Sequence, residues 1–183
     1  LVGSEMCIRD RVQELGSALF RLAALPAPRA RAVRVYENNN RLGGTSQFQH
    51  YVELDPLNSD YIEWQFPGNA GGNLYKGGGH ADLKYLGDEA APYGAQYFYE
   101  KQTNRWQNNY TDLIRFLQAL GQADSHQIPE SLPLSMNLEN WTRHLAVHDL
   151  LGNEETSLVT GDRGDYALYA GTNDPRFMLI AYD

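Results

Sequence analysis

Two stretches of the chain repeat apolar residues with the period of an amphipathic helix. The first has its apolar residues at Val12, Leu15, Leu19 and Leu22, and the second has them at Tyr110, Leu113, Ile114 and Leu117. Pro26 and Pro28 end the first predicted helix, because proline cannot continue a helical backbone. The second helix has Asn109 or Thr111 as its candidate N-cap and Gly121 just beyond its end.

A third helix is predicted to begin after Asn137, its N-cap, and to end at Gly152. Its apolar positions are Leu138, Trp141, Leu145 and Leu150. The same helix carries His144 and His148, and two histidines at this spacing can share a metal ion. No third ligand is evident, and the glutamate of a metalloprotease motif does not stand between them. We therefore expect both histidines to lie on the helix surface.

Shorter stretches alternate apolar and polar residues, which predicts β-strands. Residues 32–36 and a run from Phe48 to Leu54 are expected to form a hairpin across a turn at residues 37–44. Further strands are predicted at residues 73–76, 166–169 and 176–181, with Asn173, Asp174 and Pro175 in the last turn. Residues 61–66 fit a short helix or a strand, and the structure of residues 93–99 is left open. This mixture of elements predicts an α+β fold.

Composition narrows the classes of protein to consider. The 183 residues suit one folded domain, and 15 Lys and Arg against 23 Asp and Glu give a net charge of −8. This balance argues against a nucleic acid or an anionic membrane as partner, because phosphates need a basic face. We expect no membrane span, since no stretch approaches about 20 apolar residues. The single cysteine, Cys7, excludes an intrachain disulfide and a multi-cysteine metal site.

The first residues are unlike the remainder of the chain. Residues 1–11 follow neither a helix nor a strand period and resemble translated sequencing-adaptor sequence. We expect them to be a non-native tail, followed by one domain over residues 12–183 that is truncated at both ends.

The last part of the chain has an order of elements that protein kinases also use. A helix ends at Gly152, a loop with Asn153, Glu154 and Glu155 follows, and a strand hairpin leads to Asp183. Phosphoryl transfer needs a carboxylate near the incoming hydroxyl and oxygen ligands for magnesium. Taken alone the pattern is weak, because acidic residues in solvated loops are common.

Several motifs in their order resemble the CotH family, the spore-coat-protein-H-like atypical kinases. The resemblance rests on the following runs: Leu25-Pro26-Ala27-Pro28-Arg29, Val33-Arg34-Val35-Tyr36, Val52-Glu53, Asn73-Leu74-Tyr75-Lys76-Gly77, Tyr110-Thr111-Asp112-Leu113-Ile114, Asp165-Tyr166-Ala167-Leu168-Tyr169, Arg176-Phe177 and Ala181-Tyr182-Asp183. It implies an atypical protein-kinase-like fold, with an incomplete N-lobe and part of a helical C-lobe that holds a catalytic-loop hairpin. It also implies a transferase that uses ATP and Mg²⁺ to phosphorylate Ser or Thr of partner proteins, including spore-coat proteins.

The resemblance assigns roles to four acidic or amide residues near the end of the chain. Asp183 matches the family's magnesium-binding aspartate, and Asp165 stands where many members have an asparagine that would hold a second magnesium ion. Glu155 falls at the position of the catalytic-loop aspartate, and Asn153 keeps the family's asparagine. Because Glu is one methylene longer than Asp, Glu155 either works with a shifted loop or marks an inactive site. The alternative for each residue is an ordinary solvated side chain.

Two further residues are candidates for contacts with ATP. Lys76 lies between a strand and the glycines Gly77 to Gly79, where it could contact phosphates or be a solvated strand-end lysine. The glycines match neither phosphate-loop pattern and are expected to be turn residues. Glu53 falls at the segment that resembles the hinge beside adenine, where a base contact would come from the backbone.

An alternative function is a noncatalytic kinase-like scaffold or surface-binding protein, which Glu155 in place of Asp favours. Because the family's segment with the ATP-phosphate lysine is absent, we expect weak activity from this chain alone. The family makes a bacterial cell-surface, spore-coat or secreted location an expectation, although no signal peptide is visible. No Gly-x-Ser-x-Gly elbow supports a serine hydrolase.

Overall fold

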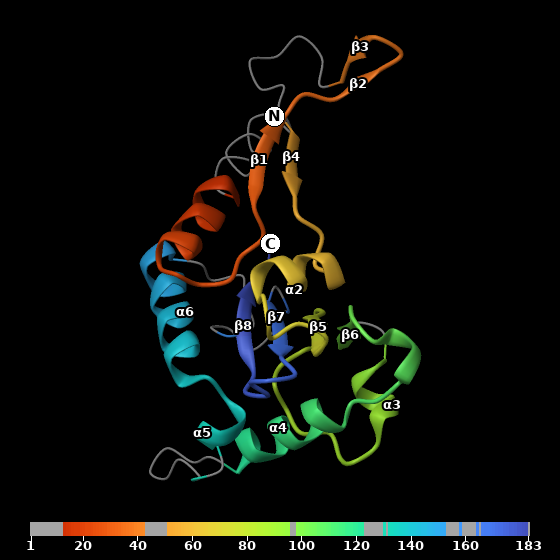
Figure 1. Ribbon diagram of the computed structural model, residues 1–183, viewed down its shortest axis with the longest axis vertical. Helices are drawn as coiled ribbons and strands as arrows, with labels where there is room; N and C mark the ends of the chain where they lie inside the picture. Colours follow the sequence, from red (N-terminus) through yellow and green to blue (C-terminus); the bar gives the residue numbers. More distant parts are fainter. Residues whose placement is uncertain are drawn as a thin grey trace.

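The computed structural model describes residues 13–42, 51–95, 98–122, 130, 132–152, 158, 164 and 166–182. Its centre is a four-stranded antiparallel sheet in the order β6-β5-β7-β8. The strands are β5 (Asn73–Gly77), β6 (Tyr99–Lys101), β7 (Tyr166–Ala170) and β8 (Met178–Ala181). Figure 1 shows this sheet with helices on both sides, which confirms the predicted α+β class.

Two smaller pairs of strands come from the first part of the chain. β1 (Ala30–Val33) pairs antiparallel with β4 (Tyr51–Leu54), so the predicted hairpin partners are confirmed. The first predicted strand was expected to continue to residue 36, but β1 ends at Val33. The chain forms a second pair, β2 (Tyr36–Glu37) with β3 (Asn40–Arg41), inside the segment predicted as a turn. In Figure 1 these pairs extend away from the sheet beyond α2 (Ser59–Gln65).

The remaining helices surround the sheet. They are helix 13–22, α3 (Ala90–Tyr93), the 3-10 helix η1 (Arg105–Gln107), α4 (Thr111–Gly121), α5 (Leu132–Ser135) and α6 (Leu138–Leu151). The ambiguous stretch at 93–99 thus contains the end of α3 and the start of β6. No described helix is long and apolar enough to cross a membrane.

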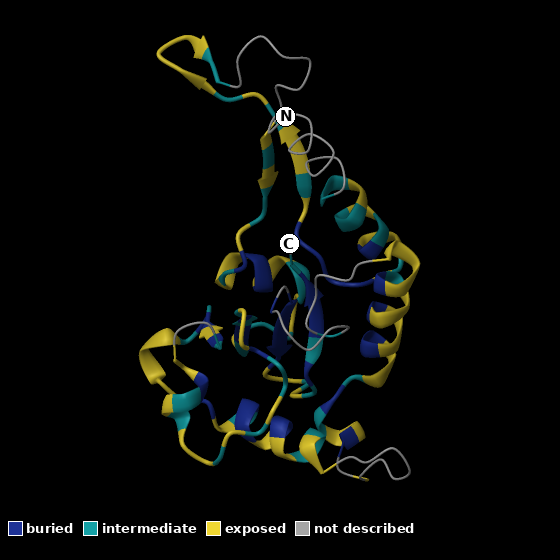
Figure 2. Ribbon diagram, turned by 180° about the vertical axis from the view of Figure 1, so that it is seen from behind, coloured by how far each residue is buried: buried dark blue, intermediate teal, exposed yellow. Residues whose placement is uncertain are grey.

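Apolar side chains form a core on each face of the central sheet, and Figure 2 shows buried residues in its strands and in the helices beside them. On one face, Tyr61 and Ile62 of α2 pack against Leu74, Tyr169 and Ile180. The larger core on the other face joins the sheet to α3, α4, α5 and α6, with Phe177 stacked on Phe116 at 4.8 Å between ring centroids. Tyr75, Tyr99 and Tyr166 of the central sheet are buried in this larger core.

The ends of α4 and α6 show how far capping can be predicted. Asn137 caps α6 as predicted, since its side chain accepts a hydrogen bond from the Asn140 N–H, and Gly152 ends the helix with a left-handed φ of 62°. The caps predicted for α4 are wrong. Tyr110 occupies the N-cap position without a side-chain hydrogen bond, and Gly121 is the last helical residue.

The buried face of α6 differs from the predicted one. Its buried residues are Asn140, Trp141, His144 and His148, whereas Leu145 and Leu150 are exposed. The expectation that the two histidines lie on the helix surface is therefore wrong. The helix presents this stripe to the edge strand β8, where the Asn140 amide donates to the Leu179 carbonyl at 3.2 Å and accepts from the Leu179 N–H at 2.7 Å.

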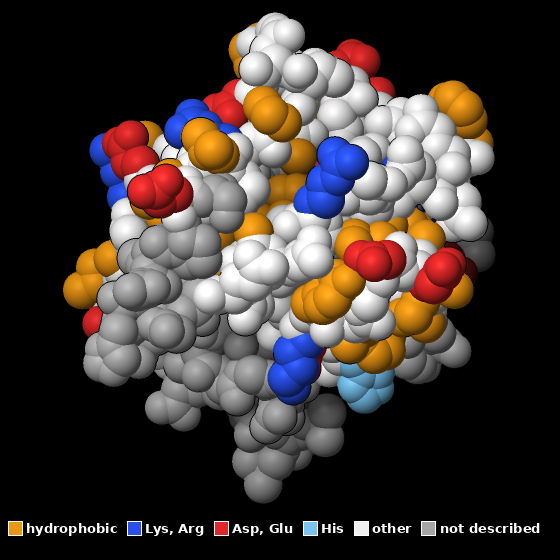
Figure 3. Space-filling view, turned by 90° about the horizontal axis from the view of Figure 1, so that it is seen from below, with side chains coloured by type: hydrophobic (Ala, Val, Ile, Leu, Met, Phe, Trp, Pro, Cys, Tyr) orange, Lys and Arg blue, Asp and Glu red, His pale blue; other side chains and the backbone are white. Residues whose placement is uncertain are grey.

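The surface seen from below mixes the two signs of charge. Figure 3 shows acidic, basic and apolar side chains interspersed over this face. Among the described residues of this face, the acidic side chains therefore do not form one patch.

Candidate functional site

Strand register brings several separate parts of the sequence to one edge of the central sheet. Lys76, near the end of β5, pairs with Ala167, near the start of β7. Tyr166, the first residue of β7, pairs with Ala181, the last residue of β8. The end of β5, the start of β7 and the end of β8 therefore lie together, and we call this place the candidate edge. Asp165 directly precedes Tyr166 in the sequence, and Asp183 directly follows Tyr182.

Lys76 connects the candidate edge to the end of the chain. Its half-buried side chain places Nζ 4.1 Å from the centre of the Tyr182 ring. This is a cation–π contact, which holds the ammonium beside β8, and within the part of the chain that the structure describes no carboxylate pairs with it. Lys76 is thus ordered on a strand next to the residue that precedes Asp183.

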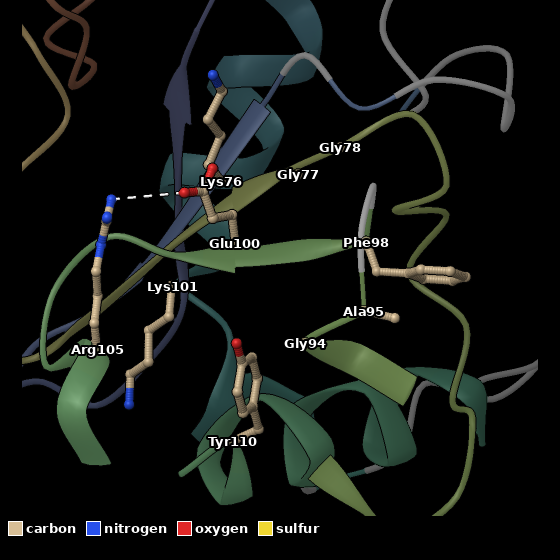
Figure 4. A pocket seen from close by; sticks show the side chains of 10 residues that line it. All are labelled: Lys76, Gly77, Gly78, Gly94, Ala95, Phe98, Glu100, Lys101, Arg105 and Tyr110. Atoms are coloured by element: carbon tan, nitrogen blue, oxygen red, sulfur yellow. Dashed lines mark ion pairs between the residues drawn. The ribbon is translucent and has the colours of Figure 1, made fainter. Parts of the chain in front are cut away.

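A cavity of about 480 Å³ adjoins the candidate edge. Lys76 and the backbone of Gly77 and Gly78 form one wall. Residues 94–95 after α3, Phe98, β6, the start of η1 and Tyr110 just before α4 complete the lining (Figure 4). Three cationic side chains, Lys76, Lys101 and Arg105, line it together with one carboxylate, Glu100. Arg105 lies 3.7 Å from Glu100 in an exposed ion pair. The described lining therefore carries an excess of positive charge, which favours an anionic ligand.

Lys101 is an unusual member of this lining because it is only 5% exposed. Its ammonium donates a hydrogen bond to the Asn109 carbonyl at 2.8 Å. Burial lowers the pKa of Lys101, and the charge of Asp112 opposes this shift. In Figure 4 the side chains of Lys76 and Lys101 extend in opposite directions. Lys76 of β5 pairs with Glu100 of β6, and Lys101, the next residue of β6, faces the other side of the sheet because successive strand residues alternate between faces. The two cations thus reach different faces.

The glycines after Lys76 allow a close approach of two backbones. A side chain at the buried Gly164 would overlap the carbonyl oxygens of Gly77 and Gly78. Gly77 was expected to be a turn residue, but it is the buried last residue of β5. The lack of a side chain at Gly164 lets this residue lie directly against the backbone of Gly77 and Gly78, which line the cavity. Gly164 is the residue that precedes Asp165.

A polar network anchors β5 to the start of α4. Asp112 accepts hydrogen bonds from the Tyr75 hydroxyl at 2.6 Å and from the Asn73 amide at 2.8 Å. Burial, followed by the Asp112 charge, raises the pKa of Tyr75, so its hydroxyl stays a donor at neutral pH. The two motifs that contain Asn73 and Asp112 therefore meet in space. Their residues fix the strand that carries Lys76.

Glu53 does not join this arrangement. It lies on β4, where it accepts a hydrogen bond from the Arg31 side chain at 2.7 Å, and both side chains are exposed. This hydrogen bond lowers the pKa of Glu53. Of the two residues predicted to contact ATP, only Lys76 lines the cavity.

The predicted catalytic and metal-binding residues Asn153, Glu155, Asp165 and Asp183 lie outside the described residues, so their roles stay predictions. Within the described part of the chain, no group of three or more His, Cys, Asp or Glu side chains could hold a metal ion. The sequence did not single out Lys101, Asp112 or Tyr182 as neighbours of the site. Asp112 and Tyr182 had a signal, since each lies within a motif that was recognised, but neither was given a role.

Comparison with known families matches residues 8–183 of the chain to the family described as CotH kinase protein. No curated protein matches the chain. The family match covers all the elements described above, including the candidate edge and the cavity.

Proposed function

Since the chain belongs to the CotH kinase family, we propose that it is an atypical protein kinase that transfers the γ-phosphoryl group of ATP to Ser or Thr of a partner protein. The observation that carries the proposal is the candidate edge. There, Lys76 and the residues adjacent in sequence to Asp165 and Asp183 come together at one end of the sheet.

The order of the described elements supports a kinase-like fold within the α+β class. The β1–β4 pair corresponds to part of an N-lobe, and β4 leads through a short segment into α2, as a hinge leads into a C-lobe. α6 then precedes the loop with the predicted catalytic residues, and the β7–β8 hairpin follows. In this proposal the backbone after β4 contacts adenine, because Arg31 already occupies the Glu53 side chain.

The candidate residues suit a nucleoside triphosphate bound together with magnesium. Asp165 and Asp183 would supply the hard oxygen ligands that magnesium prefers, and bound magnesium would neutralise charge on the phosphates. Lys76 would contact a phosphate oxygen, since its ammonium lies beside Tyr182, the residue that precedes the proposed magnesium ligand Asp183.

The two remaining candidate residues, Glu155 and Asn153, would act on the Ser or Thr of the partner protein. Glu155 would accept the proton of the Ser or Thr hydroxyl as it attacks, and Asn153 would orient the loop that carries Glu155. The extra methylene of Glu155 moves its carboxylate relative to that of an aspartate, so the loop must adjust to keep the proton within hydrogen-bond reach. By the same proposal, the partner is a protein at a bacterial cell surface or spore coat, or a secreted protein.

The direct test is transfer of labelled γ-phosphate from ATP to a serine-rich acceptor such as dephosphorylated casein. Labelling should require Mg²⁺ and fall at least 100-fold in Asp183→Asn. A suitable control is Asp149→Asn, which changes an exposed carboxylate at the end of α6 and should leave labelling intact. Equal labelling by Asp183→Asn would reject its role as a magnesium ligand.

A second candidate function is a noncatalytic kinase-like scaffold. It is favoured by Glu155, which stands at the position of the catalytic aspartate. A scaffold would label no acceptor, and the absence of magnesium-dependent binding at millimolar ATP would favour it.

A further inference from the structure

Arg29 is the last residue of the run Leu25-Pro26-Ala27-Pro28-Arg29, to which the proposed phosphoryl transfer gives no role. Its side chain contacts two other parts of the chain. Nε donates to one oxygen of the Asp55 carboxylate at 2.7 Å, and Nη2 donates to the other at 3.4 Å. The guanidinium carbon also lies 4.4 Å from the centre of the Trp64 ring of α2. Arg29, which directly precedes β1, therefore joins the residue after β4 to α2.

The backbone ladder between β1 and β4 ends at the same two residues. The Asp55 N–H donates to the Arg29 carbonyl at 3.1 Å, which continues the register of Ala30 with Leu54. In a regular antiparallel pair the second bond would run from the Arg29 N–H to the Asp55 carbonyl. The Arg29 N–H instead donates to the Asp55 carboxylate at 3.2 Å. The Asp55 carbonyl is thereby left out of the ladder at the start of the segment between β4 and α2.

The backbone that carries Arg29 is itself anchored. Residues 25–28 are all buried, and Pro26 and Pro28 restrict the backbone because their rings fix φ. The Pro26 carbonyl accepts a hydrogen bond from the Ala181 N–H of β8 at 3.2 Å. In Figure 1 this segment passes from the first described helix beside the end of β8 to β1. Arg29 thus holds the segment after β4 from a base that is fixed to the central sheet.

This anchored segment connects the two ends of the proposed ATP site. The Pro26 carbonyl is bonded to the last residue of β8, and the next residue, Tyr182, carries the ring beside the Lys76 ammonium. Three residues after Pro26, Arg29 holds Asp55, where the proposed adenine contact begins. Extended backbone advances at most about 3.6 Å per residue, so the Cα atoms of Pro26 and Arg29 are at most about 11 Å apart.

Arg31 offers a comparison within the same strand pair. It forms an ion pair of 2.7 Å with Glu53, as Arg29 does with Asp55, but this pair lies within β1 and β4 and both side chains are exposed. An exposed ion pair by itself stabilises a fold little. The contacts of Arg29 go further, because the forked hydrogen bond is combined with two backbone bonds and an indole ring. The hydrogen bond from Arg29 lowers the pKa of Asp55, which keeps the carboxylate charged at neutral pH.

We propose that Arg29 is a positioning residue for the nucleotide, which together with Asp55 and Trp64 fixes the backbone between β4 and α2 for its contact with adenine. The Asp55 carbonyl is the acceptor that this role assigns to the amino group of adenine. Guanine carries a carbonyl oxygen in place of that amino group, so the same contact favours ATP over GTP. This inference rests on the proposed function, because the adenine contact is part of it.

Hydrogen exchange measured by mass spectrometry on the whole chain, without nucleotide, tests the positioning itself. Arg29→Gln should raise the exchange of peptides that span residues 55–58 at least tenfold, because the segment loses its fork and its ring contact. Arg31→Gln should change these peptides less than threefold, and peptides from α4 should stay within threefold in both variants. An equal response of residues 55–58 to the two substitutions would overturn the proposal.

Calorimetry in the presence of Mg²⁺ tests the consequence for the nucleotide, with tripolyphosphate as a ligand that lacks adenosine. Arg29→Gln should bind ATP at least tenfold more weakly than the unaltered chain and tripolyphosphate less than twofold more weakly. It should also lose the preference of the unaltered chain for ATP over GTP. Arg31→Gln should bind both ATP and tripolyphosphate within twofold of the unaltered chain. An equal loss of the two ligands in Arg29→Gln would show a general role in the fold and overturn the proposal.

The Trp64 ring can be tested without altering the ion pair. Trp64→Ala removes the ring beside the guanidinium and should weaken ATP binding about threefold, with tripolyphosphate binding unchanged. Unchanged ATP affinity in a folded Trp64→Ala chain would contradict its part in the positioning.

The outcomes also separate this inference from the proposed function. If the unaltered chain bound no ATP at millimolar concentration, the proposed function would be rejected and the nucleotide role of Arg29 with it. If the unaltered chain bound ATP and Arg29→Gln bound it equally well, this inference alone would be overturned.

Discussion

Asp112 is the residue at which two short motifs of the sequence meet. Its carboxylate accepts from Tyr75 and Asn73 and thereby links α4 to β5, the strand that carries Lys76. Both donors would lose a charged partner if the carboxylate were removed, and Tyr75 is fully buried. Removal of the Asp112 carboxylate would therefore destabilise the contact between α4 and β5, a role that the motif around Asp112 did not indicate.

Asp112→Ala should lower the free energy of unfolding by about 2–4 kcal/mol, because it leaves a buried hydroxyl and an amide without their acceptor. Urea denaturation followed by circular dichroism measures the change. Asp149→Ala removes an exposed carboxylate of α6 and should stay within about 0.5 kcal/mol. A loss below about 0.5 kcal/mol for Asp112→Ala would show that the network does not stabilise the fold.

Gly164 and Gly79 offer a matched pair of glycines near the cavity. A methyl group at Gly164 would overlap backbone oxygens of Gly77 and Gly78, whereas Gly79 has open space around the same position. Gly164→Ala should therefore displace the segment before β7, lower the melting temperature by several degrees and weaken ATP binding at least tenfold. Thermal unfolding and calorimetry measure both effects. If Gly164→Ala and Gly79→Ala behaved alike, the close approach would have no role in the site.

At the scale of elements, periodicity predicted where helices form better than which faces they bury. Helix 13–22 exposes Leu15 and Leu22 and buries Phe20 against two histidines of α6. α6 buries Asn140 rather than its leucines, because the edge strand β8 offers unpaired backbone groups that an amide satisfies. A search for periodic apolar residues does not detect buried polar residues such as Asn140, His144 and His148 of α6.

Phe20→Ala should lower the free energy of unfolding by about 3–5 kcal/mol, since it removes a ring packed on two imidazoles. Leu22→Ala, on the same helix but 82% exposed, should change it by less than about 0.5 kcal/mol. Chemical denaturation of both variants makes the comparison. Equal losses would mean that helix 13–22 presents another face to the molecule.

For the whole molecule, local pattern predicted most strands but not how they assemble. The strands near residues 73–76, 166–169 and 176–181, and the pairing of β1 with β4, followed from alternation and turn residues. The placement of β5 between β6 and β7 did not, because that order depends on contacts between distant segments. Lys76 was therefore predicted as a candidate residue, while its contact with Tyr182 required the assembled sheet.

The central claim is that the candidate edge binds ATP through Lys76 and magnesium held by Asp183, and calorimetry of ATP binding tests it most directly. The chain should bind ATP in the presence of Mg²⁺, with affinity at least tenfold lower without Mg²⁺, in Lys76→Ala and in Asp183→Asn. Lys84→Ala, which removes an exposed lysine outside the cavity lining, should bind like the unaltered chain. Absence of binding at millimolar ATP, or equal affinity with and without Mg²⁺ in all variants, would contradict the account.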